Sequence, residues 1–231
     1  MGDFDPVTPF PLFDSSLHTP SELRSLAQQT DEWLGLRIPE IESKLAAHGC
    51  RKRAPDSSKE KQQLWFGLEP QKLLTPYSEI RALLESLNLQ PGQTVVDLGA
   101  AYGRMGFVIA RCFPLVNFIG YEYVGERVEE SRRCLARFSS CANVRMEHAD
   151  LAAADFAPVE ADIYFIYDFG PLKAIEKTLY DLKRLARRRP VILVGRGRHS
   201  RYLIETRHRW LTCVDPHAPE GPSTIYKGLD V

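Results

Sequence analysis

Val95-Val-Asp-Leu-Gly-Ala-Ala-Tyr-Gly-Arg104 joins the end of an apolar strand to a loop with two glycines. The residues around Asp97 are typical of a short strand that is buried on both faces of a sheet. Gly99 and Gly103 permit backbone conformations and close approaches that other residues avoid. In open α/β sheets, a loop at the carboxyl end of a strand is the usual binding place of nucleotide-like ligands. The stretch therefore predicts a parallel α/β sheet with a ligand site at this loop.

Strands and helices are expected to alternate on both sides of this loop. Apolar residues recur at helical spacing in some segments, whereas short continuous apolar runs mark strands. Helices are expected over 77–88, 103–112, 125–138 and 172–187, and strands over 94–98, 117–122, 143–148, 161–167 and 190–194. Short strands that alternate with helices favour βαβ units and a parallel sheet covered on both faces.

The end of the chain departs from this alternation. Candidate sixth and seventh strands lie at 209–214 and 223–227, and the link between them is rich in proline and has no helical pattern. Two strands without an intervening helix are expected to be antiparallel neighbours. The predicted fold class is therefore α/β: a doubly wound, mostly parallel, seven-stranded Rossmann-like sheet with an antiparallel last strand.

The N-terminal quarter of the chain has a different pattern. The first 19 residues show no sustained period and are expected to form an extended arm. Apolar residues at helical spacing follow, with an interruption at Pro39. Residues 48–59 are polar and contain a proline, which favours a loop. We therefore predict an N-terminal arm and helical appendage over 1–60 and a main domain over 61–231.

Composition places the chain among ordinary globular proteins. It has 231 residues, no formal net charge and 44% hydrophobic residues, which is enough apolar surface for a sizeable core. No apolar run approaches the roughly 18–20 residues that span a bilayer, and the N-terminus lacks the features of a secretory signal. The five cysteines have no Cys-x-x-Cys spacing and indicate neither a disulfide framework nor a zinc site. We expect a cytoplasmic protein without a membrane partner, and composition leaves its oligomeric state open.

Two cofactor classes compete for the glycine loop. A dinucleotide loop needs glycines at relative positions 0, 2 and 5, which here hold Gly99, Ala101 and Arg104, so the third position fails. Asp97 would repel a pyrophosphate, whereas a carboxylate at this place suits a ligand with a cationic amino group. S-adenosylmethionine has a sulfonium and an amino-acid tail and lacks a pyrophosphate. The local chemistry therefore favours S-adenosylmethionine over NAD.

Two further acids follow the next two strands. Glu122 ends the second strand, where an acidic side chain can accept hydrogen bonds from both ribose hydroxyls of a nucleoside. Asp150 follows the third strand, where it can accept from an adenine amino group. Each acid alone is also typical of a helix cap or a solvated loop. Together with Asp97, however, they place three carboxylates after three successive strands, which favours a nucleoside cofactor along this edge of the sheet.

The motif and the strand-end acids resemble those of the class I, or seven-strand, S-adenosylmethionine-dependent methyltransferases. The resemblance covers about residues 64–228 and includes the antiparallel final strand. The family's first motif, commonly Asp-x-Gly-x-Gly-x-Gly, corresponds to residues 97–103, with Ala101 in place of the middle glycine.

The resemblance implies roles for the residues at the strand ends. Four residues would line the methionine end of the cofactor: Asp97, Gly99, Ala101 and Gly103. Glu122 would bind the ribose, and Asp150 would bind the adenine. Three neighbouring residues complete this part of the expected cofactor-binding set: Tyr102, Tyr123 and Leu151.

The fourth strand ends in Ile166-Tyr-Asp-Phe-Gly-Pro171, where this family places its transfer site. The stretch lacks the Asn/Asp-Pro-Pro-Tyr of amino-methylating nucleic-acid and glutamine enzymes. It also lacks the Asp-Asn pair of the metal-dependent catechol-type enzymes, so no metal is implied. Asp168 is a candidate to orient a substrate amine or take its proton. Tyr167 and Phe169 are candidates for a channel wall, and we count Tyr167 and Asp168 among the cofactor-binding residues. The alternative is that Asp168 is a structural cap and the aromatic residues are packing.

Thr75-Pro-Tyr77 precedes the first core helix and resembles a motif of two groups of lysine methyltransferases. These are the histone enzymes without a SET domain and the mitochondrial and prokaryotic ATP-synthase c-subunit type. The resemblance implies that Thr75, Pro76 and Tyr77 fold over the cofactor and border the acceptor channel. Tyr77 therefore joins Asp168 and Phe169 as a candidate catalytic residue. The alternative is a helix N-terminus with Thr75 as N-cap and Pro76 at the first helical position.

These motifs favour a methyltransferase that acts on a lysine side chain of a protein. A basic region over residues 183–209 offers either a surface for phosphates or a solvated helix face. An RNA or small-molecule methyltransferase is therefore an alternative, with nucleic acid bound through this region. A non-catalytic module that binds S-adenosylmethionine is a second alternative, and an NAD-dependent oxidoreductase is a third.

Overall fold

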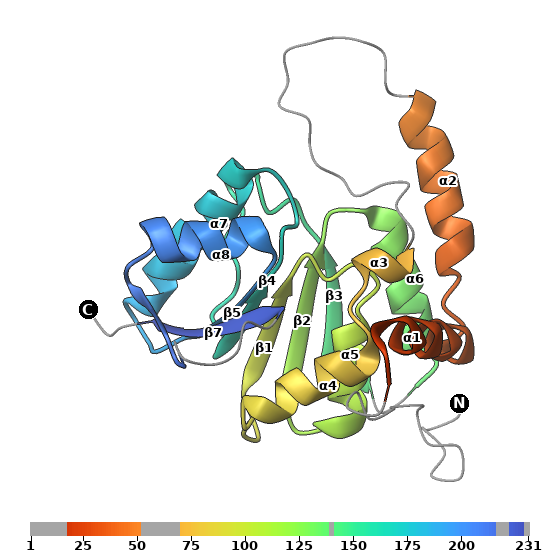
Figure 1. Ribbon diagram of the computed structural model, residues 1–231, viewed down its shortest axis with the longest axis horizontal. Helices are drawn as coiled ribbons and strands as arrows, with labels where there is room; N and C mark the ends of the chain where they lie inside the picture. Colours follow the sequence, from red (N-terminus) through yellow and green to blue (C-terminus); the bar gives the residue numbers. More distant parts are fainter. Residues whose placement is uncertain (1–17, 52–69, 139–140, 216–221, 229–231) are drawn as a thin grey trace.

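The computed structural model describes residues 18–51, 70–138, 141–215 and 222–228 (Figure 1). Its helices are α1 (Pro20–Leu34), α2 (Ile38–Arg51), α3 (Pro70–Leu73), α4 (Tyr77–Ser86), α5 (Arg104–Cys112), α6 (Gly125–Leu135), α7 (Leu172–Ala186) and α8 (Arg198–Arg207). Its strands are β1 (Thr94–Leu98), β2 (Asn117–Glu122), β3 (Val144–His148), β4 (Ile163–Ile166), β5 (Ile192–Arg196), β6 (Leu211–Cys213) and β7 (Ser223–Gly228). Each predicted strand is present.

The strands form one sheet in the order β3-β2-β1-β4-β5-β7-β6. β1 lies between β2 and β4, and Asp97 is in parallel register with Gly120 on one side and Phe165 on the other. The strand order reverses at β1, which is the place where open α/β sheets bind ligands. β7 is antiparallel to both of its neighbours, β5 and β6. The predicted fold class is therefore confirmed.

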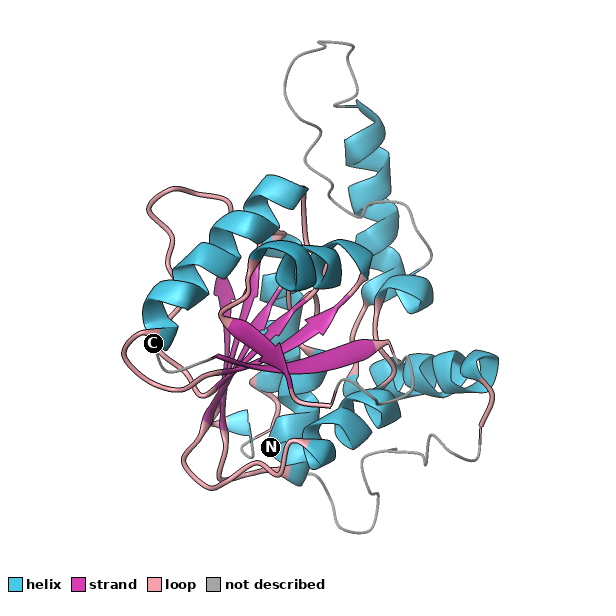
Figure 2. Cartoon of the chain, turned by 60° about the vertical axis from the view of Figure 1, so that its left-hand side comes forward, coloured by secondary structure: helices cyan, strands magenta, loops and turns pink. Residues whose placement is uncertain are grey.

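Helices cover both faces of the sheet (Figure 2). One buried cluster joins side chains of α1, α4, α5 and α6 to strand residues such as Val95 and Phe118. The other joins α7 and α8 to strand residues such as Val96 and Tyr164. Successive residues of a strand point to opposite faces, so Val95 and Val96 enter different cores. This double burial explains why the strands appear in the sequence as continuous apolar runs.

The N-terminal helices begin and end at signals in the sequence. The Thr19 side chain accepts from the amide of Glu22, and the Glu22 carboxylate accepts from the Thr19 amide at 2.7 Å, which caps α1. Gly35 ends α1 in the left-handed conformation, with φ 75°. α2 begins next to the predicted interruption at Pro39 and continues to Arg51. The prediction of a loop from residue 48 is therefore wrong for its first four residues.

The described part of the N-terminal region shares its core with the sheet. Ala27, Leu34 and Ile38 are buried in the same cluster as the side chains of α5. Arg37, between α1 and α2, donates to the buried carboxylate of Glu130 on α6 at 2.7 Å. The predicted boundary between residues 60 and 61 lies outside the described residues.

The sequence patterns do not predict α3 or α8. α3 has only four residues. α8 buries only Ser200, Leu203 and Ile204, which are too few positions to produce a helical period. Over the described ranges, no helix is long and apolar enough to cross a membrane.

Candidate functional site

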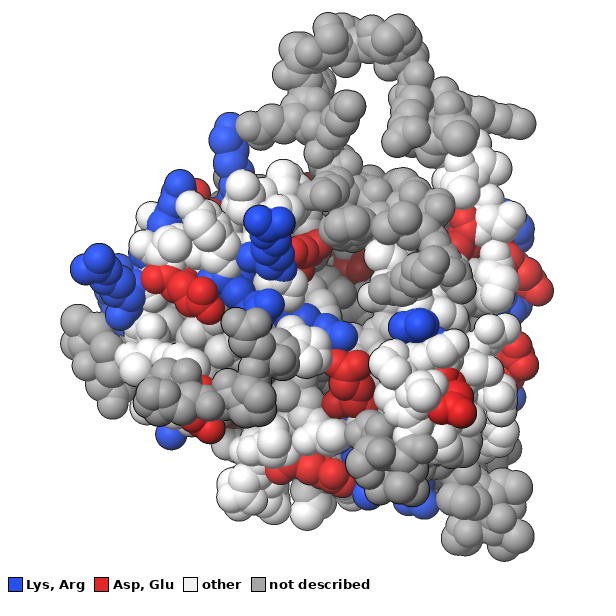
Figure 3. All heavy atoms as spheres, viewed as in Figure 1, with Lys and Arg blue, Asp and Glu red and all other residues white. Residues whose placement is uncertain are grey.

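A cavity of about 730 Å³ lies at the carboxyl end of β1. In Figure 3 a hollow lies near the centre of this face, with acidic and basic side chains beside it. Most of the predicted site residues line the cavity: Thr75, Asp97, Gly99, Ala101, Tyr102, Glu122, Tyr123, Asp150, Leu151, Tyr167, Asp168 and Phe169. Tyr77 and Gly103 are outside its described wall.

Asp97 lies at the end of β1 with only 6% of its surface exposed. Its Oδ1 atom is buried and has no hydrogen-bond partner among the described residues. Burial raises the pKa of Asp97 to about 7, and the nearby Glu122 adds to this effect. A buried carboxylate without a partner costs free energy, which a bound donor would offset. The position therefore suits a cationic group, such as an amine, held in the cavity.

The loop over residues 99–103 requires unusual backbone conformations. Gly99 has φ 102°, and a Cβ atom there would lie 2.8 Å from the Cβ atom of Phe169. Gly103 has φ 71° and is backed by Ser131 and Met146, so it supports the loop from behind. Ala101 also has a positive φ, 47°, although it carries a side chain. The alanine at the family's middle glycine thus keeps a conformation that normally favours glycine.

Glu122 connects this loop to the end of β2. One carboxylate oxygen accepts from the amide of Ala101 and the other from the amide of Val124, both at 2.9 Å. The guanidinium of Arg127 lies 3.7 Å from Oε1. Because Glu122 is buried and lines the cavity, it presents fixed acceptors to a ligand that lies between β1 and β2.

Asp150 and its neighbours form the part of the wall that follows β3. Asp150 is half-buried, and its Oδ1 accepts from the amide of Ala152 at 2.9 Å. The buried side chain of Leu151 and the exposed ring of Tyr123 line the cavity with it. An acid beside apolar and aromatic surface suits a nucleobase with an exocyclic amino group.

Tyr102 lines the cavity, but its hydroxyl donates to Glu42 of α2 at 2.7 Å.

Tyr77 points away from the cavity. Its ring is 2% exposed and its hydroxyl donates to Asp31 of α1 at 2.7 Å, while the guanidinium of Arg104 lies over the ring at 5.0 Å. Tyr77, predicted to border the cofactor and the acceptor channel, thus lies outside the described cavity wall, and its ring fastens α1 to α4.

Thr75, two residues before α4, does line the cavity. Its hydroxyl oxygen lies 3.0 Å from the hydroxyl of Tyr167, which follows β4. Pro76 is the N-cap residue of α4, and the helix has no side-chain cap. The alternative interpretation of Thr75 as N-cap is therefore wrong, since its hydroxyl faces the end of β4 instead.

Asp168 accepts three hydrogen bonds from the beginning of α8. They come from the amides of His199 and Ser200, at 3.1 and 2.8 Å, and from the Ser200 hydroxyl at 2.8 Å. Gly197 permits this approach, because a Cβ atom there would lie 2.5 Å from the carboxylate carbon. A carboxylate at a helix N-terminus satisfies amides that lack partners within the helix. The geometry therefore favours the structural interpretation of Asp168, as a cap supplied from another element.

Tyr167 and Phe169 contribute an aromatic wall after β4. Burial raises the pKa of Tyr167 to about 12, so its hydroxyl stays protonated at neutral pH. The guanidinium of Arg196, on β5, lies over this ring at 5.5 Å and forms an ion pair with Glu79 of α4. Tyr167, Arg196 and Glu79 are thus engaged with one another at this end of the cavity.

Two buried arginines of the wall form ion pairs that no local sequence pattern predicts. Arg104 and Arg127 are buried against two acids of the N-terminal helices, Asp31 and Glu42. An isolated Arg or Glu in a helix is most often exposed, so the sequence gives no reason to expect these pairs. Only Arg104 has a local signal, because it directly follows the glycine motif.

Five of the ten basic residues in the region over 183–209 form ion pairs with acids. These ion pairs are Arg184–Asp181, Arg188–Glu160, Arg189–Asp162, Arg196–Glu79 and Arg207–Glu176. In Figure 3 acidic side chains lie among the basic ones over α7 and α8. This arrangement is closer to a solvated helix face than to a continuous cationic patch.

No protein-family model matches the sequence, and no curated protein matches it. Solved structures match its fold. A SAM-dependent methyltransferase from Aquifex aeolicus aligns with a TM-score of 0.51 at 15% identity, over 70% of this chain and 100% of that one. TrmN from Thermus thermophilus aligns with a TM-score of 0.51 at 17% identity, over 67% of this chain and 49% of that one. The chain therefore has the fold of the class I S-adenosylmethionine-dependent methyltransferases.

Proposed function

We propose that this protein is an enzyme that transfers the methyl group of S-adenosylmethionine to an acceptor. The observation that carries the proposal is the buried Oδ1 of Asp97, which lacks a hydrogen-bond partner among the described residues and belongs to the cavity wall. Gly99 beside it leaves no room for a side chain. Both features fit the amino-acid tail of the cofactor, because its ammonium group would pair with Asp97 and backbone amides of the loop would face its carboxylate.

The three strand-end acids would each hold one part of the cofactor. Asp97 would orient the amino group, and Glu122 would accept from the ribose hydroxyls with the lone pairs that its two amide bonds leave over. Asp150 would accept from the adenine amino group, with Leu151 and Tyr123 against the base. When bound, S-adenosylmethionine supplies an electrophilic methyl group on a cationic sulfur. The task of the protein is then to align an acceptor with that group and to exclude water.

We infer that the acceptor is a lysine side chain of a protein. The end of the cavity away from β3 is walled by Thr75, Pro76, Tyr167 and Phe169. Apolar and aromatic surface of this kind suits the alkyl stem of a lysine. The amine must lose a proton before transfer. Because Asp168 is committed to α8, we assign it to holding this wall in place rather than to taking that proton.

One observation favours a second acceptor class, an RNA or a small anionic molecule. Arg196 and Arg201 line the same cavity and would attract a phosphate or carboxylate. Arg196 already forms an ion pair with Glu79, and this negative charge weakens its attraction for an anion. Nucleic acid would reach this end of the cavity across the basic region over 183–209.

Labelling of a cell lysate tests both the methyltransferase activity and the assignment of lysine as the acceptor. The protein is incubated with lysate and with S-adenosylmethionine that is tritiated in its methyl group, and Asp97→Asn protein is the matched control. We expect a labelled protein band that survives nuclease and releases methylated lysine on hydrolysis. Label that disappears with nuclease, or that enters small molecules alone, would contradict the lysine assignment and leave the methyltransferase standing.

Binding measurements separate the remaining alternatives. Tight binding of S-adenosylhomocysteine without transfer to any acceptor pool would make the protein a non-catalytic module. Thermal stabilisation by NAD in place of S-adenosylhomocysteine would overturn the cofactor assignment itself.

A further inference from the structure

A carboxylate of the N-terminal helices reaches into the cavity. Glu42 of α2 is 6% exposed and lies in the cavity wall. It accepts from Nε and Nη2 of Arg127, on α6, at 2.8 and 3.1 Å. It also accepts from the hydroxyl of Tyr102 at 2.7 Å. One acid from outside the βαβ core is therefore bound both by the loop after β1 and by the helix after β2.

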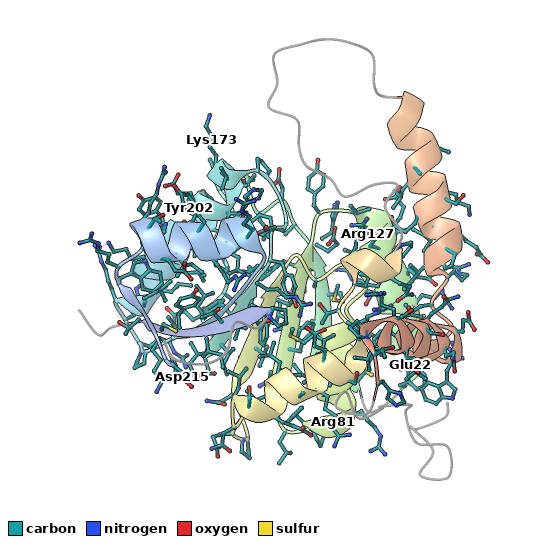
Figure 4. All side chains as sticks on the ribbon, in the orientation of Figure 1. Glu22, Arg81, Arg127, Lys173, Tyr202 and Asp215 are labelled. Carbon is teal, nitrogen blue, oxygen red and sulfur yellow. The ribbon has the colours of Figure 1, made fainter. Side chains whose placement is uncertain are left out.

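The same arginine faces the acid that follows β2. Nη1 of Arg127 lies 3.7 Å from Oε1 of Glu122, which is longer than an ordinary hydrogen bond. The two nitrogens nearest to Glu42 are occupied by that residue, so Arg127 is held back from Glu122. In Figure 4 the labelled Arg127 lies near the beginning of α6, beside the lower part of α2.

We propose that Glu42 is a positioning residue for the ribose-binding carboxylate, and this inference rests on the proposed function. Glu42 holds Arg127 at a distance that leaves the acceptors of Glu122 available to ribose hydroxyls. If Glu42 lost its charge, the buried guanidinium would seek its nearest remaining counter-charge, which is Glu122. A close Arg127–Glu122 pair would then compete with the ribose for the same oxygens.

A second contact on the other side of Gly103 supports this role of the N-terminal helices. Arg104 donates from Nε to Asp31 of α1 at 3.1 Å and from Nη1 to the carbonyl of Thr75 at 3.0 Å. The residues on both sides of Gly103 are thus bound by acids of α1 and α2. The helices of the N-terminal region are therefore part of the cofactor site.

Two variants that break the same ion pair test the proposal, because only one of them should change the preference for a ligand with ribose hydroxyls. The ligands are S-adenosylhomocysteine and its 2′,3′-dideoxy analogue, measured by calorimetry. In the unaltered protein, the hydrogen bonds of the ribose hydroxyls to a carboxylate should make the affinity for S-adenosylhomocysteine about tenfold higher than that for the dideoxy analogue. Glu42→Gln should lose most of this preference, whereas Arg127→Gln should keep it, because it removes the competing cation. Equal loss in both variants, or no loss in Glu42→Gln, would overturn the positioning role.

Arg37→Gln is the matched control, because it weakens the attachment of α1 and α2 to α6 without changing the Glu42–Arg127 pair. Arg37 binds the buried Glu130 through its amide and its guanidinium, at 2.8 and 2.7 Å, and lies outside the described cavity wall. This variant should keep the ribose preference, and its loss here would also contradict the proposal. If a single variant fails to fold, the double variant Glu42→Gln/Arg127→Gln takes its place. It leaves neither charge of the pair buried without its partner, and it should keep the preference for the ribose hydroxyls. Unaltered protein that binds neither ligand would contradict the proposed function instead, so the two failures are distinguishable.

Discussion

The two ends of the cavity differ in how their polar groups are satisfied. At the end formed by β1, β2 and β3, Asp97 has a buried oxygen without a hydrogen-bond partner among the described residues. At the end formed by β4 and β5, Asp168 accepts three hydrogen bonds from α8, and Tyr167 and Arg196 contact polar or charged neighbours. The first end thus presents that oxygen to a polar ligand, whereas Asp168, Tyr167 and Arg196 at the second end already have partners within the protein. We infer that charge and hydrogen bonding select the cofactor, and that shape and aromatic surface select the acceptor.

Gly99→Val should have the largest effect on the cofactor end. A Cβ atom would lie 2.8 Å from Phe169, and a β-branched residue does not tolerate φ 102°. We expect a loss of about 100-fold in affinity for S-adenosylhomocysteine and of about 3 kcal/mol in the free energy of unfolding, measured by calorimetry and denaturant titration.

Gly92→Val is the control for backbone strain alone. Gly92 has φ 83° and nothing within 4 Å of an added Cβ atom. Gly92→Val should lower the free energy of unfolding by about 1–2 kcal/mol and leave the affinity for S-adenosylhomocysteine unchanged. Equal losses of affinity in both variants would mean that Gly99 has no special place in the site.

The affinity for S-adenosylhomocysteine should rise with pH through neutrality. The pKa of Asp97 is raised by burial from an ordinary value of 3.8 to about 7, so the carboxyl is neutral below this pH and anionic above it. Between pH 6 and pH 8 we expect an increase of about tenfold, which Asp97→Asn should abolish. The empty protein should show the opposite trend, because a raised folded-state pKa stabilises it at low pH and this stability is lost between about pH 3.8 and 7. A flat binding profile would contradict the role of Asp97.

Asp168→Asn tests the role of the acid at the end of the cavity formed by β4 and β5. If Asp168 caps α8, the variant should cost about 1 kcal/mol of stability and slow methyl transfer less than about tenfold. If Asp168 takes the acceptor's proton, transfer should slow by about 100-fold to 10,000-fold with little change in stability. Thermal unfolding and single-turnover labelling distinguish the two results. Thr19→Ala, which removes the cap of α1, should cost a similar free energy without slowing transfer.

Ala101→Gly should have the smallest effect. An alanine in the left-handed conformation lowers the free energy of unfolding by about 1–2 kcal/mol. Glycine removes this strain, but its greater freedom in the unfolded chain lowers the free energy of unfolding by about 0.5–1 kcal/mol. The net gain of about 0.5 kcal/mol should raise the melting temperature by about 1–2 °C. Asn88→Gly, at φ 49° and outside the described cavity wall, is the control. An unchanged or lower melting temperature in Ala101→Gly would show that φ 47° is not strained.

The cofactor end could be predicted from the sequence, because each of its acids directly follows a strand. The ends of parallel strands meet at one edge of a sheet, so Asp97, Glu122 and Asp150 were expected to lie together, and they do line one cavity. The fold was predictable for the same reason, since strands buried on both faces leave apolar runs of a recognisable length.

The rest of the site could not be predicted, because its contacts join distant segments. Glu42 and Arg127 are 85 positions apart and leave no local pattern. Asp168 caps α8, a helix whose few buried residues give no helical period. Tyr77 follows a proline in a motif that resembles a channel wall, yet a buried acid of α1 attracts its hydroxyl away from the cavity. Sequence patterns report which residues are near in the chain, whereas these partners are near only in space.

The role of Asp97 in binding the cofactor's amino-acid tail is tested most directly by comparing two ligands on Asp97→Asn and on the unaltered protein at pH 8. S-adenosylhomocysteine has the amino-acid tail, and 5′-methylthioadenosine lacks it. We expect the unaltered protein to prefer S-adenosylhomocysteine by about 100-fold, because a charge-assisted hydrogen bond to a buried carboxylate contributes about 3 kcal/mol. Asp97→Asn should lose this preference while it binds 5′-methylthioadenosine as before. An equal preference in both proteins would show that Asp97 does not bind the amino-acid tail.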